Sequence, residues 1–173
     1  TLFPYTTLFR SILVLGVGNI LLSDEGIGVR VIEALEQRYV LPDNVDVLDG
    51  GTAGMELLEA MASRTHLIIV DAIVSRKSEP GELLILRDDE VPVLFNNKIS
   101  PHQLGLSDVL SALRFTGEFP DKITLVGVIP HSLEPNIGLT PTVEASLEPA
   151  LQAVLAALQE SGITPALRER AHV

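Results

Sequence analysis

The sequence predicts an α/β fold: a single three-layer domain with a twisted, mostly parallel five-stranded sheet flanked by helices on both faces. Short runs rich in Val, Ile and Leu alternate along the chain with segments of helical periodicity, as they do in parallel sheets with crossover helices. The length of 173 residues suits one domain. Hydrophobic residues make up 46% of the chain, which is too apolar for a disordered protein.

Five runs are predicted to form strands. They are Ile12–Val17, Val45–Leu48, Leu67–Asp71, Glu82–Leu86 and Ile123–Ile129. The first, third and fifth runs are almost continuously apolar, as strands covered on both faces usually are. We therefore expect these three strands to be central in the sheet.

Apolar residues at helical spacing predict helices between these strands. One helix is expected to begin after Gly26 and another after Gly54. A third is expected to begin with Ser100 as the N-cap, Pro101 as the first helical residue and Gln103 closing a capping box.

The last predicted helix carries a buried stripe that runs from Val143 to Leu158. Pro149 interrupts this stripe, and proline is poorly tolerated inside a helix. The pattern therefore predicts either a kink at Pro149 or a later helix start near Ser146.

The two ends of the chain differ from the domain, which we place at residues 12–166. Residues 1–11 contain Phe3, Tyr5 and Phe9, three of the chain's five Phe and two Tyr residues. We expect this leader to be extraneous or disordered and unrelated to function. Residues 167–173 are predicted to be a frayed tail.

Charge and cysteine content exclude several classes of function. The chain has 12 Lys and Arg against 23 Asp and Glu, a net charge of −11, so we expect no nucleic-acid partner. It has no cysteine, which excludes thiolate nucleophiles and thiolate metal sites.

The apolar run after Ile12 contains Asn19 and ends before Asp24, so it is too short to span a bilayer. We expect no membrane association and a cytoplasmic location.

Familiar cofactor and catalytic motifs are incomplete or absent. Gly16 and Gly18 follow a strand, but Leu21 occupies the place of the third glycine of a dinucleotide-binding G-x-G-x-x-G motif. We therefore expect no nucleotide cofactor, although an enzyme with a degenerate nucleotide loop remains an alternative. The G-x-S-x-G and H-E-x-x-H signatures do not occur.

Three side chains that could bind a metal follow predicted strands or open a helix. Glu25 follows the first strand, Asp71 ends the third, and His102 lies in the first turn of a helix. Ligands of such sheets bind beyond the carboxyl ends of the strands, and two carboxylates with one imidazole suit nickel or zinc. The helix dipole is expected to lower the pKa of His102 and keep the ring neutral.

Each of these residues also has an ordinary structural explanation. Glu25 could be an acidic residue favoured at a helix N-terminus. Asp71 could cap a loop, and His102 could be an ordinary polar residue beside a proline.

Three motifs give the chain a family resemblance. They are G-V-G-N-I-L-L-S-D-E-G-I-G at 16–28, D-G-G-T-A-G at 49–54 and S-P-H-Q-L-G at 100–105. From Ile12 to about Ala166 the chain resembles the maturation endopeptidases of nickel–iron hydrogenases. The motifs occur together and in this order, which makes the resemblance far more specific than any single motif above.

The resemblance implies a site-specific endopeptidase, grouped with aspartic-type peptidases. Such an enzyme removes the C-terminal extension of the hydrogenase large-subunit precursor after nickel insertion. The family's metal ligands correspond to Glu25, Asp71 and His102, and the nickel is expected to come with the precursor. We expect a monomer. A non-catalytic module that binds precursor or nickel remains the alternative.

The catalytic roles stay open at this point. Nickel could orient the scissile bond or polarise its carbonyl; alternatively, Asp71 or Glu25 could act as general base on a water while the metal serves only recognition. We expect Gly50, Gly51 and Thr52 to form a backbone cradle for the substrate, unless this loop is only a tight turn into the next helix.

Overall fold

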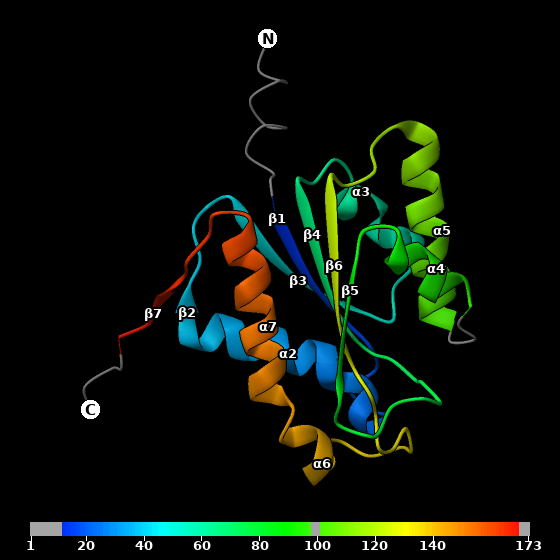
Figure 1. The fold of residues 1–173 in the computed structure, drawn as a ribbon, viewed down its shortest axis with the longest axis vertical. Coiled ribbons are helices and arrows are strands. Elements are labelled where there is room, and N and C mark those ends of the chain that lie inside the picture. The colour runs from blue at the N-terminus through cyan, green and yellow to red at the C-terminus, as the bar shows by residue number, and fades with distance from the viewer. Residues whose placement is uncertain (1–11, 98–100, 170–173) are drawn as a thin grey trace.

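Five strands form one sheet in the order β3-β1-β4-β6-β5 (Figure 1). Their bounds are β1 Ile12–Val17, β3 Val45–Gly51, β4 His66–Ala72, β5 Leu83–Arg87 and β6 Lys122–Val128. Strand β5 is antiparallel to β6, and all other neighbours are parallel. This computed structural model describes residues 12–97 and 101–169. The leader 1–11 and the expected N-cap Ser100 lie outside the described residues.

Helices cover both faces of this sheet (Figure 1). The longer ones are α2 Ile27–Arg38, α4 Glu90–Asn96, α5 Pro101–Thr116 and α7 Leu147–Glu160, and the short ones are η1 Ser23–Gly26, η2 Met55–Leu57, α3 Leu58–Met61 and α6 Pro141–Glu144. Helices α2 and α7 pack on one face, and α3, α4 and α5 on the other. Within the described ranges, no helix combines the length and apolar character needed to cross a membrane.

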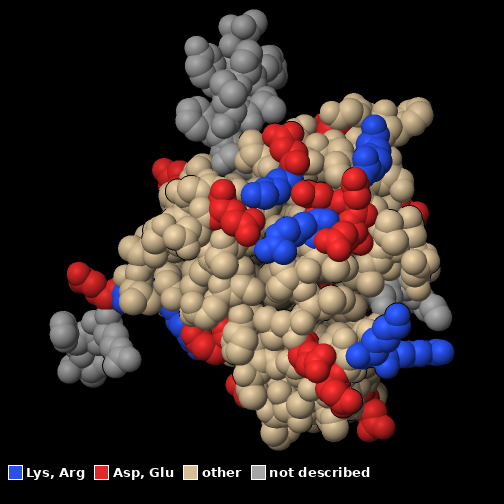
Figure 2. All heavy atoms as spheres, in the orientation of Figure 1, with Lys and Arg blue, Asp and Glu red and all other residues tan. Residues whose placement is uncertain are grey.

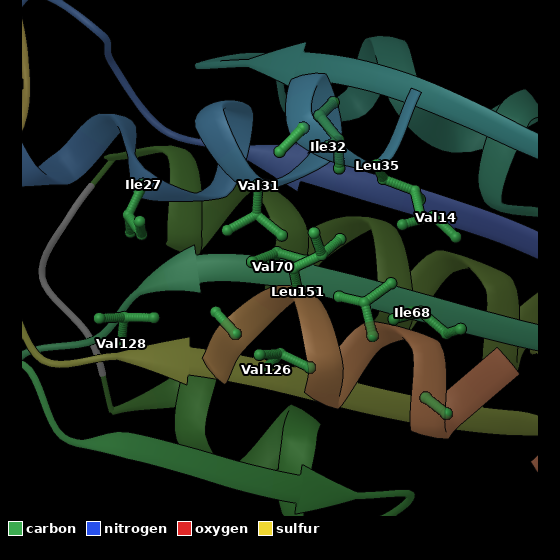
Figure 3. Close-up of a cluster of buried hydrophobic side chains, with 14 of the residues drawn as sticks. Val14, Ile27, Val31, Ile32, Leu35, Ile68, Val70, Val126, Val128 and Leu151 are labelled. Atoms are coloured by element: carbon green, nitrogen blue, oxygen red, sulfur yellow. The ribbon is translucent and has the colours of Figure 1, made fainter. Parts of the chain in front are cut away.

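The sheet separates two apolar cores because successive strand residues point to opposite faces. On β4, Ile68 and Val70 belong to the core under α2 and α7 (Figure 3). Leu67 and Ile69 belong to the core under α5. The same alternation directs Asp71, the next residue of this second row, toward the α5 layer.

Most of the predicted architecture is confirmed. The fold class is correct, and β1, β4 and β6 are the three interior strands. The last helix begins at Leu147 with Ser146 at the N-cap position. Pro149 therefore lies in the first turn, where its missing N–H costs no hydrogen bond, and the later start was the correct alternative.

Two regions differ from the sequence-based prediction. The helix expected after Gly54 is only η2 followed by the four-residue α3, and helix α4 was not predicted. The start of the predicted frayed tail is paired: β7 (Ala166–Leu167) is antiparallel to β2 (Tyr39–Val40). The Arg168 N–H also donates to the Arg38 carbonyl.

His66, the first residue of β4, is fully buried at the edge opposite the strands' carboxyl ends. Its ring nitrogens hydrogen-bond with Ser161 Oγ at 2.7 Å and Thr124 Oγ1 at 2.8 Å. Burial lowers the pKa of His66 from 6.5 to about 4; the charge of Lys122 adds to this, and the carboxylates of Glu160 and Asp88 oppose it.

We expect this histidine to make stability depend on pH. Because its folded-state pKa lies below 6.5, the unfolded chain takes up the proton first on acidification. The free energy of unfolding should therefore fall as pH drops from 6.5 to about 4. Urea unfolding across this window should show a smaller loss in His66→Gln than in the wild type, and equal losses would contradict the assignment.

Candidate active site

The turn that carries Glu25 is positioned by the close packing of α2 on two strands. Glu25 lies in η1, which leads directly into α2. A Cβ atom on Gly28 would lie 2.2 Å from the carbonyl oxygen of Val70 and 2.5 Å from that of Val17. Only glycine permits this approach, so the start of α2 and the preceding Glu25 lie beside the ends of β1 and β4.

Asp24, the neighbour of Glu25, connects this turn to a distant loop. Its buried carboxylate accepts the N–H groups of His131 and Ser132 at 2.9 Å and that of Thr140 at 2.8 Å, and also the Thr140 hydroxyl. Burial alone would raise the pKa of Asp24, but these donors lower it below its usual value. The sequence offered no signal for this role, because the partners lie more than 100 residues away.

Asp71 is completely buried near the end of β4 and faces the first turn of α5. The Gln103 amide donates to Asp71 Oδ2 at 3.0 Å and to the Ala72 carbonyl at 3.2 Å. His102 Nε2 lies 3.4 Å from both Asp71 carboxyl oxygens. Burial raises the pKa of Asp71, and the hydrogen bonds from His102, Gln103 and the Ala72 N–H only partly oppose it.

The His102 ring lies between two carboxylates. Its Nδ1 is 3.3 Å from Glu25 Oε1, while Nε2 faces Asp71. Burial alone would lower the pKa of His102, but the hydrogen bond to Asp71 and the charges of Asp71 and Glu25 outweigh it and raise the pKa. The net shift of the His102 pKa is therefore upward, opposite to the lowering expected from the helix dipole.

The structure thus brings together Glu25, Asp71 and His102, but in a linear order. In the described part of the chain, no three His, Asp or Glu side chains are grouped as they would be around one metal ion. The side chains are 17% exposed for Glu25, 4% for His102 and 0% for Asp71. The donor types fit nickel, and Glu25 is the most exposed of the three side chains.

The structure also defines the roles of Asp71 and two residues near it in the fold, Gln103 and His131. Asp71 is not a loop cap, because it lies within β4 and contacts side chains of α5. Gln103, which was expected to close a capping box with Ser100, also donates to the Asp71 carboxylate; the capping contact itself involves Ser100, outside the described residues. His131 is exposed, and its backbone N–H donates to Asp24 Oδ2.

The expected substrate cradle forms a closed turn at the end of β3. The Gly51 N–H donates to Asp49, the Gly51 carbonyl accepts the Gly18 N–H, and the Gly50 carbonyl accepts the Ala53 N–H. Thr52 is exposed. These backbone groups therefore stabilise the turn, and a substrate role for Gly50, Gly51 and Thr52 stays a prediction.

Comparison with known proteins assigns the family. The profile described as hydrogenase maturation protease matches residues 29–157. The chain is 76% identical to the hydrogenase 2 maturation protease of Escherichia coli K12 over 161 residues, which are 93% of this chain and 98% of that protein. The chain belongs to the hydrogenase maturation protease family. The resemblance inferred from the motifs is thus confirmed.

Other relatives support the same family assignment. This chain is 45% identical to the hydrogenase expression/formation protein HoxM of Azotobacter vinelandii, over 92% of this chain and 77% of HoxM. The solved E. coli endopeptidase HybD superposes with a TM-score of 0.90 at 76% identity, over 91% of this chain and 98% of that one. The HybD protease of Thermococcus kodakarensis gives 0.69 at 25% identity, over 83% and 96%.

We expect Asp24→Asn to destabilise the protease by about 1–3 kcal/mol, because an amide NH₂ group would face donors that need an acceptor. Chemical denaturation measures this change. The matched control is Asp43→Asn, since Asp43 is an exposed loop residue. Equal stability of the two variants would show that the Asp24 contacts contribute nothing.

Proposed function

We propose that the protease removes the C-terminal extension of a nickel–iron hydrogenase large-subunit precursor in one specific cut. It acts after nickel insertion and uses the inserted nickel for recognition. The observation that supports this proposal most directly is the His102 ring held between Glu25 and Asp71 beyond the ends of β1 and β4. In such sheets this edge is where ligands bind.

Recognition begins at Glu25, since this is the only one of the three side chains with appreciable exposure. Nickel arrives as part of the precursor, where the precursor's cysteine thiolates hold it. The protease contains no cysteine and offers only harder oxygen and nitrogen donors, so it can contact the metal without removing it from soft ligands. His102 and Asp71 reach the same ion when the imidazole turns.

The different exposure of the two carboxylates supports different roles for them in hydrolysis. A water molecule must lose a proton to a base as its oxygen attacks the scissile carbonyl carbon, and the departing nitrogen must gain a proton. Glu25 is the carboxylate that water and peptide can reach. Asp71 is fully enclosed and bonded to Gln103, which suits a residue that orients His102. Polarisation of the carbonyl by nickel is compatible with this arrangement.

We expect Glu25→Gln, Asp71→Asn and His102→Ala each to lower the processing rate by about 100-fold or more while the protein stays folded. Precursor and product are separated by gel electrophoresis, and circular dichroism checks the fold. His131→Ala is the matched control, because this histidine is exposed and outside the site. Processing at the wild-type rate by all three variants would refute the assignment.

Nickel-loaded precursor should be cleaved and nickel-free precursor should not, if the metal is the recognition element. The measurement is the shift in size of the large subunit after incubation with the protease. A control with nickel salt added to protease and nickel-free precursor separates inserted from free metal. Equal cleavage of loaded and unloaded precursor would contradict nickel recognition, and binding without cleavage would favour a non-catalytic module.

A further inference from the structure

A cavity of about 610 Å³ adjoins the candidate active site, a volume typical of ligand pockets. Gln103 lines this cavity and also donates to Asp71. Ile73 and Val74 line it as well and follow the end of β4 directly. Glu25, Asp71 and His102 do not line the cavity, but Gln103 places it directly beside the site.

The walls of the cavity are apolar, and its rim is basic. Leu84, Leu94 and Leu133 contribute apolar surface from three different segments of the chain. Arg76 and Lys77 also line it and are both exposed. Figure 2 shows basic side chains projecting over the segment that links β4 to β5.

These two cations differ from the other Lys and Arg residues that the structure describes. Six of those form ion pairs: Arg30, Arg38, Arg64, Arg87, Arg114 and Lys122. Arg168 donates to the Glu36 carbonyl. Within residues 12–97 and 101–169, the side chains of Arg76 and Lys77 take part in none of the ion pairs or hydrogen bonds. In a chain of net charge −11, an uncompensated basic pair beside the site is a specific attraction for carboxylates.

We propose that this cavity, here called the extension groove, binds the part of the precursor's C-terminal extension that flanks the scissile bond. An apolar side chain of the extension enters the groove, and a nearby Asp or Glu side chain pairs with Arg76 and Lys77. This inference rests on the proposed function and adds a determinant of substrate specificity to it. Substrates with neutral or basic extensions lack this pairing with Arg76 and Lys77 and are therefore disfavoured.

The first test measures binding without cleavage. A fluorescein-labelled synthetic peptide of the extension is titrated with wild-type protease and with Arg76→Gln/Lys77→Gln, and fluorescence anisotropy gives Kd. Two exposed ion pairs predict a Kd about three- to tenfold higher in the variant, with the difference decreasing in 0.5 M salt. This readout is independent of processing, so it still decides the inference if the wild type fails to cleave the precursor.

The matched control is Arg87→Gln/Lys122→Gln. This pair also removes one Arg and one Lys, of which Arg87 is exposed and Lys122 half-buried, and both pair with Glu160. It lies at the amino-terminal ends of the parallel strands, opposite the site. We expect an unchanged Kd for this control, and an equal weakening by both double variants would overturn the groove assignment in favour of a general charge effect.

The second test uses nickel-loaded precursor and compares KM with kcat. Arg76→Gln/Lys77→Gln should raise KM about three- to tenfold at unchanged kcat. Replacing the Asp and Glu residues of the extension by Asn and Gln should raise the KM of the wild-type protease by the same factor. The same substrate change should not raise the KM of the Arg76→Gln/Lys77→Gln variant any further. Independent, additive losses would overturn the pairing.

A third substrate form identifies the source of the carboxylate. Adding a Gly-Ser-Gly-Ser segment after the natural C-terminus displaces the terminal carboxylate but leaves the acidic side chains in place. We expect unchanged KM. A rise in KM equal to that of the double variant would assign the cations to the chain terminus and overturn the proposal for side-chain carboxylates. Failure of the wild type to cleave any precursor would refute the proposed function alone.

Discussion

The contact between Gly28 and the carbonyl oxygens of Val17 and Val70 determines where α2 begins and therefore where Glu25 lies. The contact is reciprocal, because a Cβ atom on Gly16 would lie 2.5 Å from the Gly28 carbonyl oxygen. Glycines at the end of β1 and at the start of α2 thus let a helix and two strands approach through their backbones. Gly16 also forms, with Gly18, the G-x-G spacing that resembles part of a dinucleotide motif; both arrangements bring a helix start close to a strand end.

A second constraint comes from burying Asp71 near the end of an apolar row. A buried carboxylate is costly unless polar groups surround it, and Gln103, His102 and the Ala72 N–H supply them. The His102 imidazole lies between Asp71 and Glu25, so each of its two ring nitrogens faces one carboxylate. The site therefore depends on α5 as much as on the strands, which accounts for the two buried polar side chains, His102 and Gln103, in the first turn of that helix.

The sequence was most informative where structure follows from local pattern. Continuous apolar runs identified the interior strands, and chain order placed Glu25 and Asp71 at the same edge of the sheet. It was least informative where long-range contacts decide the outcome. The pKa direction of His102 depends on two carboxylates distant in sequence. The role of Asp24 depends on its contacts with His131, Ser132 and Thr140, which lie 107 to 116 residues away. The stretch after Gly54 forms only η2 and the four-residue α3, and Met55 at its start is exposed.

The site also connects the two helical layers that the sheet otherwise separates. Glu25 belongs to the turn that leads into α2, on one face, and His102 belongs to α5, on the other. The 3.3 Å separation of these two side chains therefore measures how the layers are positioned relative to each other at the sheet's edge. A small shear of one layer would separate Glu25 from His102 while every strand pairing stayed intact.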